Sequence, residues 1–242
     1  MAEAHALILI VDDEPAVRAV LSQALADEGF KTIEAANGAE ALRRLDENPI
    51  DLVTLDLGLG DVGGLEIARE IRAKKNLPIV MITGLNRPLD RVTGLEHGAD
   101  DYITKPFNIR EVALRLRNVL KRYARPIGLR DNGSAGTKCY AFDGCVLDMK
   151  KREVRSNRGE TLDLTDLEFR LLLLLLQNST RVLTRDEISR ALNGHDWSPL
   201  DRTIDGHIAR LRRKLEAPAE EPRLIKSVRG VGYVLASDVS RL

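Results

Sequence analysis

Ile8-Leu9-Ile10-Val11-Asp12-Asp13 is an apolar run that ends on two adjacent carboxylates, and similar runs recur through the first half of the chain. Segments with apolar residues three or four positions apart separate these runs, and this spacing is typical of amphipathic helices. Strands that alternate with helices indicate a parallel sheet with helices on both faces. Residues 1–122 are therefore predicted to form an α/β domain with a doubly wound, five-stranded parallel sheet. Its expected strands are Ala6–Val11, Thr32–Ala35, Leu52–Leu55, Ile79–Thr83 and Tyr102–Thr104.

A change of composition divides the chain in two. Residues 123–138 include Pro126, Gly128 and Asp131-Asn132-Gly133-Ser134 and contain little to bury, which is typical of a flexible linker. Residues 1–122 hold 16 Lys or Arg against 20 Asp or Glu, whereas the remainder holds 21 against 17. An acidic half joined to a basic half fits a control domain attached to a domain that binds a polyanion.

Residues 139–242 begin with short β-like segments and continue with helical ones, which predicts a small α+β domain. Two capping-box pairs, Thr165 with Glu168 and Thr184 with Glu187, mark the starts of two helices. The first helix contains the run Leu171–Leu176 and is expected to be buried on most sides. A third, basic helix is expected from about Leu200 to Leu215, followed by a hairpin over Ile225–Leu235.

Several classes of protein are excluded by composition. No apolar run approaches the roughly 20 residues that cross a bilayer, and residues 1–5 do not read as part of a signal peptide. We therefore expect a cytoplasmic protein with no membrane partner. The two cysteines, Cys139 and Cys145, lack CxxC spacing and nearby histidines, which argues against a disulfide framework or a zinc site.

The ends of the predicted strands carry a set of polar residues, Asp12-Asp13, Asp56, Thr83 and Lys105. Ligands of doubly wound sheets bind outside the carboxyl ends of the strands. Three converging carboxylates repel one another unless a cation joins them, and an all-oxygen site suits Mg²⁺. Taken singly, each aspartate also fits a helix cap or a turn. Together they predict a magnesium-dependent site in which one carboxylate attacks phosphorus.

Residues 6–122 resemble the receiver domains of two-component response regulators, which have a flavodoxin-like fold. The matching stretches are Ile8-Leu9-Ile10-Val11-Asp12-Asp13-Glu14, Leu55-Asp56-Leu57, Ile82-Thr83-Gly84 and Gly94-Leu95-Glu96-His97-Gly98-Ala99-Asp100-Asp101-Tyr102-Ile103-Thr104-Lys105-Pro106-Phe107. The resemblance implies that Asp56 accepts a phosphoryl group from a sensor histidine kinase. It implies a Mg²⁺ site made by Asp12, Asp13, Asp56 and the carbonyl of Gly58.

The same resemblance gives roles to three further residues. Thr83 and Lys105 are expected to contact the phosphoryl group, and Thr83 and Tyr102 are expected to form a switch pair that remodels the face of the fourth helix, fifth strand and fifth helix. One departure from the family concerns the loop after Asp56. Family members usually have a proline followed by an Asp-Gly or Asn-Gly pair there, whereas this chain has Leu59-Gly60 and Gly63-Gly64, with Gly60 replacing the proline. Glycine lacks the fixed backbone angle of proline, so this loop is expected to be more mobile and to alter the rate of phosphorylation or the phosphoryl lifetime.

Charged residues surround apolar ones on the fourth and fifth helices, a pattern that also fits an ordinary solvated surface. Receivers of the OmpR/PhoB type resemble this arrangement and use it for a two-fold dimer. The resemblance implies a homodimer in the phosphorylated state, with Arg91 meeting Glu111 and Asp101 meeting Arg115 across the interface. The full predicted interface comprises Arg91, Val92, Leu95, Glu96, Asp100, Asp101, Glu111, Ala113, Arg115, Leu116 and Arg117.

Residues 140–236 resemble the OmpR/PhoB winged-helix domain through Leu164–Phe169, Arg202–Leu215 and Val228–Tyr233. Along the basic helix the apolar residues share one face, which leaves a polar face to read DNA. Arginine suits both guanine edges and phosphates, and a helix fits the major groove. The implied DNA contacts are Arg202, Thr203, His207, Arg210, Arg213, Ser227 and Arg229, with Arg210 the best candidate for a base contact. His207 equally fits a packed helix residue.

These inferences converge on a DNA-binding response regulator. The resemblance implies that a sensor histidine kinase phosphorylates Asp56 and that the protein then dimerises. We expect it to bind double-stranded DNA and to regulate transcription at specific promoters, with RNA polymerase as a further partner. The protein is expected not to be an enzyme, apart from slow loss of its own phosphoryl group. A magnesium-dependent phosphatase is the enzyme alternative, but the sequence lacks a DxD-type motif and a cap insertion. A regulator controlled without phosphate is the other alternative, and it predicts that Asp56→Ala leaves promoter binding and dimerisation unchanged.

Overall fold

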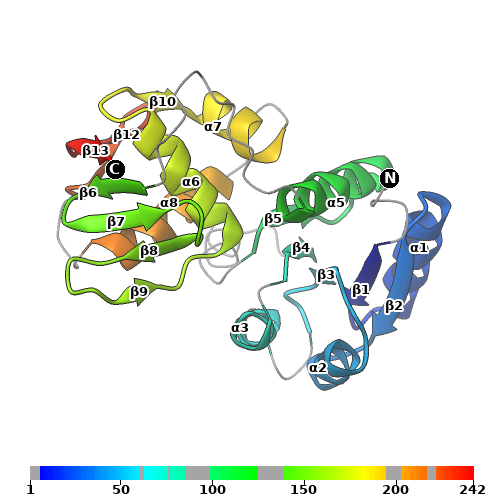
Figure 1. Cartoon of the computed structure of the whole chain (residues 1–242). Coiled ribbons are helices and arrows are strands. Elements are labelled where there is room, and N and C mark those ends of the chain that lie inside the picture. Colours follow the sequence, from blue (N-terminus) through cyan, green and yellow to red (C-terminus); the bar gives the residue numbers. More distant parts are fainter. Residues whose placement is uncertain are drawn as a thin grey trace. The chain divides into compact units, whose positions relative to one another are not determined.

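The computed structural model describes residues 6–59, 63–75, 77–84, 99–124, 139–194, 203–216 and 222–242 (Figure 1). The chain forms two compact units, residues 1–124 and 125–242. Helix α5 (Ile109–Ala124) ends the first unit and includes residues 123 and 124, the first two of the predicted linker. The rest of that linker lies outside the described residues. None of the helices in the described ranges combines the length and apolar character that crossing a membrane requires.

The first unit is built on a five-stranded parallel sheet in the order β2-β1-β3-β4-β5. The predicted doubly wound fold is confirmed, and the strand bounds differ from the predicted ones by one residue at most. The central strands are rich in Ile, Leu and Val because both of their faces are buried. The strands are β1 (Leu7–Val11), β2 (Lys31–Ala35), β3 (Leu52–Leu55), β4 (Ile79–Thr83) and β5 (Asp101–Thr104).

Helices cover both faces of this sheet (Figure 1). Helix α1 (Pro15–Asp27) and α5 lie on one face, and α2 (Gly38–Glu47) and α3 (Gly64–Lys74) lie on the other. The alternation of side chains along a strand divides the core between them. In β1, Ile8 and Ile10 pack in the cluster that contains α1 and α5, whereas Leu9 and Val11 pack with α2 and α3.

The second unit contains two sheets and three described helices. Strands β6 (Cys139–Phe142), β7 (Cys145–Asp148), β8 (Glu153–Arg155) and β9 (Thr161–Leu162) form the expected antiparallel sheet, and β13 (Val239–Arg241) adds to its edge beside β6. Cys139 and Cys145 are free thiols. The smaller sheet has the order β10-β12-β11, made of β10 (Leu183–Thr184), β11 (Ile225–Val228) and β12 (Gly232–Leu235).

The helices of this unit are α6 (Asp166–Gln177), α7 (Arg185–Asn193) and α8 (Thr203–Leu215). Both predicted capping boxes form, at the N-termini of α6 and α7. The leucines of the run 171–176 are buried except Leu174, which is half-buried, so the prediction of a core helix is confirmed. Gly232 is required where β12 meets β10, because a Cβ there would lie 1.9 Å from the carbonyl oxygen of Leu183. The unit is a winged helix, with β11 and β12 as its hairpin.

Candidate functional site

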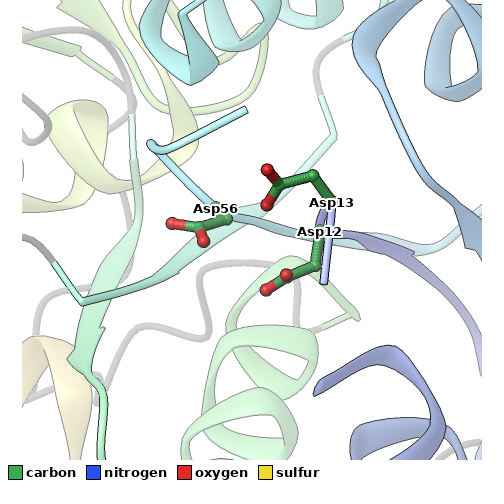
Figure 2. Close-up of side chains that lie close together, drawn as sticks. All are labelled: Asp12, Asp13 and Asp56. Atoms are coloured by element: carbon green, nitrogen blue, oxygen red, sulfur yellow. The ribbon is translucent and has the colours of Figure 1, made fainter. Parts of the chain in front are cut away.

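Three carboxylates meet at the carboxyl ends of two neighbouring strands in the first unit. Asp12 follows β1 and Asp56 follows β3, and the pairing of Val11 with Leu55 aligns these two strand ends. One oxygen from each of Asp12, Asp13 and Asp56 lies within 4.8 Å of the others (Figure 2). Asp12 and Asp56 are buried, whereas Asp13 is exposed. The arrangement gives a hard, all-oxygen donor set that opens to solvent on one side.

Lys105 supplies positive charge to this cluster. Its Nζ lies 2.8 Å from Asp12 Oδ2 and 2.8 Å from Asp56 Oδ2. Burial alone would lower the pKa of the Lys105 ammonium, but the hydrogen bonds to these carboxylates outweigh burial and raise the pKa above its ordinary value. Burial raises the pKa of Asp12, and the bond from Lys105 offsets part of this rise. Lys105 therefore stays charged and partly compensates the two buried carboxylates.

The remaining residues predicted for this site lie nearby in the fold. Thr83 is fully buried at the end of β4, and Tyr102 in the neighbouring strand β5 is 9% exposed and packs in the core. The backbone N–H of Gly58 donates to Asp56 Oδ1 at 3.2 Å. This bond orients the carboxylate of Asp56. Gly60 lies outside the described residues, so the expectation of a mobile loop stays a prediction.

Sequence reasoning did not single out two residues that hold the site in place. Arg18 on α1 donates from Nη1 to the carbonyl oxygen of Asp12 at 2.7 Å and forms an ion pair with Glu34 on β2. Glu14 lies 3.2 Å from Lys105 Nζ. The contact of Arg18 with a backbone carbonyl oxygen leaves no pattern in the sequence, so sequence reasoning had no signal by which to find it.

Gly64, the first residue of α3, packs directly on the backbone of Asp56. A Cβ at Gly64 would lie 2.2 Å from the carbonyl oxygen of Asp56 and 2.8 Å from Cα of Leu57. Both of these atoms belong to the backbone, which cannot swing away as a side chain can. In the pair Gly63-Gly64, this packing role belongs to Gly64. A Cβ on Gly63 would meet nothing within 4 Å.

In the second unit, helix α8 is more deeply buried than its sequence pattern predicts. Ile204, Ile208 and Leu211 face the core as expected, but the polar residues Thr203, His207 and Arg210 are also buried, at 2%, 1% and 4% exposure. The prediction that Thr203 and Arg210 lie on an exposed face is therefore wrong in this structure, and the burial of His207 fits its alternative as a packed helix residue. Whether these residues contact DNA stays a prediction. Arg202 lies outside the described residues.

The burial of Arg210 has a local cause. Its Nε lies 3.0 Å from Oε1 of Glu168, a fully buried carboxylate on α6, and its guanidinium also contacts Nδ1 of His207. A charge is tolerated in a protein interior when it is paired in this way. The burial of His207 and its contact with Arg210 favour the packed helix residue over the DNA contact.

Three of the predicted DNA contacts are exposed, and they lie on the second half of α8 and on the hairpin of β11 and β12. Arg213, Ser227 and Arg229, all predicted DNA contacts, are exposed. Arg212 fastens the hairpin to α8, because it donates to the carbonyl oxygen of Ile225 at 2.9 Å and to Oγ of Ser227 at 2.9 Å. These contacts hold a basic helix end beside an exposed hairpin.

Comparisons with known proteins identify both units. Residues 8–117 match the family described as "Response regulator receiver domain", and residues 159–235 match "Transcriptional regulatory protein, C terminal". The aerobic respiration control protein ArcA of Escherichia coli is 37% identical over 96% of this chain and 97% of its own length. The CpxR homolog of Haemophilus influenzae is 40% identical over 95% of this chain and 99% of its own length. The chain belongs to the OmpR/PhoB family of response regulators. It is a DNA-binding regulator of transcription in a two-component system and not an enzyme.

A solved structure agrees with the fold of this response regulator. A mutant of RitR superposes with a TM-score of 0.69 at 23% identity, covering 95% of this chain and 98% of RitR. At this identity the likeness concerns the fold alone. The likeness supports the predicted fold, an α/β unit followed by a winged helix.

The predicted dimer face of this response regulator is only partly described. Arg91, Val92, Leu95 and Glu96 lie outside the described residues. Ala113 and Leu116 on α5 are buried in the core of the receiver, at 1% and 0% exposure. Both side chains already pack within their own chain, so they are not exposed here, and their part in a dimer interface stays a prediction.

Asp100 is also part of the receiver interior, at 1% exposure. Its Oδ2 accepts from the backbone N–H of Ile79 at 2.8 Å and from the guanidinium of Arg72, and its Oδ1 accepts from the hydroxyl of Tyr123 at 3.0 Å. Arg117 bonds instead to Glu28 at the end of α1, with Nη2 2.6 Å from Oε2. Asp100 is therefore internal, whereas Arg117, whose side chain is 34% exposed, joins α5 to the end of α1.

The remaining predicted pair forms within one chain. Arg115 Nη1 lies 3.0 Å from Asp101 Oδ1, and Arg115 Nε lies 2.9 Å from Glu111 Oε1. Asp101 is buried, Arg115 is half-buried and Glu111 is exposed. Pairing of Asp101 with Arg115 across a dimer interface would therefore require an exchange of these internal bonds.

Proposed function

We propose that this response regulator accepts a phosphoryl group on Asp56 from a sensor histidine kinase. An oxygen of the Asp56 carboxylate attacks phosphorus, the phosphorus–nitrogen bond of the donor histidine breaks, and an acyl phosphate forms on Asp56. The observation that carries the proposal is the 2.8 Å contact between Lys105 Nζ and Asp56 Oδ2, next to a carboxylate cluster at the carboxyl edge of the sheet. Lys105 is placed to move from the carboxylate to a phosphoryl oxygen.

The proposal includes a Mg²⁺ site. Asp12, Asp13 and Asp56 would hold the ion, with the carbonyl of Gly58 as a further ligand, and the donor set fits because hard cations prefer carboxylate and carbonyl oxygens. When bound, Mg²⁺ neutralises charge on the phosphoryl oxygens. Without the ion, Lys105 is the cation that pairs with the buried carboxylate of Asp12 among the described residues.

The phosphoryl signal is proposed to travel from Thr83 to Tyr102 and to favour a homodimer. Thr83 ends β4 and Tyr102 lies in the adjacent strand β5, so a change at the site has a short path to α5. The proposed dimer uses the face of the fourth helix, β5 and α5. In it the internal bonds of Asp101, Glu111 and Arg115 are exchanged for bonds to the second copy, and charged pairs of this kind set orientation and partner choice more than affinity.

The winged-helix domain is proposed to bind promoter DNA through Arg213, Ser227 and Arg229, with RNA polymerase as a further partner. Their exposure supports this set. Contacts from arginine to phosphates supply salt-dependent affinity, and contacts to base edges supply sequence preference. The roles of Arg202, Thr203 and His207 stay predictions from the family resemblance.

Phosphoryl incorporation tests the proposal directly. The purified chain is incubated with Mg²⁺ and acetyl phosphate, and the intact mass is measured. We expect one added phosphoryl group, lost in Asp56→Asn and retained in Asp46→Asn, whose carboxylate is exposed and pairs with Lys74 away from the cluster. Equal incorporation in Asp56→Asn would place the acceptor elsewhere, and no incorporation in the unsubstituted chain would contradict the proposal.

A further inference from the structure

Strand β11 forms the first half of the exposed hairpin and lies at the edge of its sheet. The sheet has the order β10-β12-β11, so β11 has a neighbour on one side only among the described strands. The carbonyl oxygen of Leu224 accepts from the N–H of Ala236 at 2.7 Å and so points toward the β12 side. Backbone groups alternate in direction along a strand, so those of Ile225 point to the open side. An edge of this kind needs partners that are not strands.

The end of α8 supplies these partners. Oε1 of Glu216, the residue after α8, accepts from the backbone N–H of Ile225 at 2.9 Å, and its Oε2 accepts from the N–H of Arg223 at 3.0 Å. Arg212 donates to the carbonyl oxygen of Ile225 at 2.9 Å. The N–H of Glu216 donates to the carbonyl oxygen of Arg212 at 2.7 Å, so the two side chains leave the helix one turn apart. Together they pair with the outer edge of β11 as a neighbouring strand would.

The carboxylate of Glu216 is suited to this place because both of its oxygens accept a backbone N–H. Hydrogen bonds to an ionised carboxylate are roughly twice as strong as neutral ones. Glutamine has one acceptor oxygen, and its amide NH2 would face a second N–H donor. The side chain of Glu216 is half-buried, which limits the competition from water. The two bonds therefore hold the start of β11 to the end of α8.

This connection joins two elements that both carry predicted DNA contacts. Arg213 is exposed on α8, and Ser227 and Arg229 are exposed on the hairpin of β11 and β12. A surface that binds through two separate elements gains affinity when their spacing is fixed beforehand, because the cost of ordering them is not met on binding. The spacing of the helix and the hairpin is thus a property that Glu216 can set.

We propose that Glu216 is a positioning residue for DNA binding, which fixes the hairpin at the end of α8 so that Arg229 and Arg213 meet DNA together. The inference rests on the proposed contacts of these two arginines with DNA. The charge of Glu216 on its own repels phosphates. The sign of the effect therefore separates the two roles, because removal of the charge alone strengthens binding, whereas loss of the fixed spacing weakens it.

The salt dependence of binding by Glu216→Gln tests the proposal. The full chain is titrated with random-sequence duplex DNA at several salt concentrations. The logarithm of the binding constant falls with the logarithm of salt concentration, with a slope of about −0.9 per phosphate neutralised. We expect weaker binding and a slope shallower by about 0.9, as the contact of Arg229 is lost. That change narrows the difference in affinity from the unsubstituted chain about 3.5-fold between about 50 and about 200 mM salt.

Two further substitutions give the controls. Glu160 is exposed in the turn between β8 and β9, so Glu160→Gln removes the same charge, and its slope should equal that of the unsubstituted chain. Arg229→Gln should reproduce the slope of Glu216→Gln. The variant with both substitutions should lose no more than either one alone, because both changes remove the same contact.

An unchanged slope or tighter binding in folded Glu216→Gln would overturn the proposal, and so would additive losses in the double variant. A role of Glu216 in stability alone would lower the unfolding temperature and leave the slope unchanged, which also overturns it. Glu216→Asp decides the matter if Glu216→Gln does not fold. It keeps the charge on a side chain one carbon shorter, so the slope should again become shallower, and the slope of the unsubstituted chain would overturn the proposal.

Hydrogen exchange of the free chain separates this inference from the proposed function. The N–H of Ile225 should exchange faster in Glu216→Gln than in the unsubstituted chain, because it loses its acceptor. Equal exchange would overturn the inference whatever the salt dependence. Absence of DNA binding by the unsubstituted chain, or an unchanged slope in Arg229→Gln, would instead contradict the proposed DNA contacts.

Discussion

Replacement of Gly64 by alanine should damage the receiver at a single backbone contact. The new Cβ would lie 2.2 Å from the carbonyl oxygen of Asp56 and 2.8 Å from Cα of Leu57, and neither atom belongs to a movable side chain. Overpacking of this kind costs up to about 3 kcal/mol, and alanine regains at most about 1 kcal/mol over glycine in a helix. We therefore expect a net loss of about 2 kcal/mol in the free energy of unfolding.

Hydrogen exchange of the β1 and β3 amides in the full chain is a suitable assay, because it reports the opening of the receiver separately from that of the second domain. A loss of about 2 kcal/mol accelerates exchange roughly thirtyfold, at 1.4 kcal/mol per tenfold. The rate of phosphorylation by acetyl phosphate should also fall, since the backbone of Asp56 must shift. Gly63→Ala is the control, because its Cβ would meet nothing within 4 Å. Exchange and phosphorylation that match the unsubstituted chain in Gly64→Ala would refute the reasoning.

Two further substitutions test the internal contacts of the receiver. Asp100→Asn removes the carboxylate that pairs with Arg72 and should lower the free energy of unfolding by about 3 to 5 kcal/mol, measured by hydrogen exchange. Weaker dimerisation with unchanged stability would instead indicate that Asp100 acts in the dimer interface. Arg18→Ala removes the bond to the carbonyl oxygen of Asp12 and should weaken Mg²⁺ binding about tenfold in a calorimetric titration. The exposed Arg43→Ala is its control, and equal affinities in the two variants would rule out a positioning role for Arg18.

The carboxylate site of the receiver is the part of the molecule that the sequence predicted most completely. Asp12 and Asp56 converge because each follows a buried strand, and parallel strands end at one edge of the sheet. Local pattern alone did not reveal Arg18, whose partners are the carbonyl oxygen of Asp12 and the side chain of Glu34. A backbone acceptor carries no sequence signature. Strand β13 was missed for a related reason, because its pairing with β6 joins segments far apart in the chain.

On helix α8, hydrophobic periodicity predicts the buried apolar residues but does not predict which polar residues are exposed. The spacing of Ile204, Ile208 and Leu211 correctly identifies the core side, and the same rule assigns Arg210 to solvent. The rule fails there because a charged side chain can be buried when a partner of opposite charge is buried with it. That partner, Glu168, is identified in the sequence only as a helix cap.

The central claim is that the phosphoryl group on Asp56 controls DNA binding. Mapping of bound DNA across the genome, with the unsubstituted chain and with Asp56→Ala under the same inducing condition, tests it most directly. We predict discrete promoter sites for the unsubstituted chain and loss of most of them in Asp56→Ala, at equal protein abundance. The same sites with equal occupancy in both would contradict the claim and would indicate a regulator controlled without phosphate.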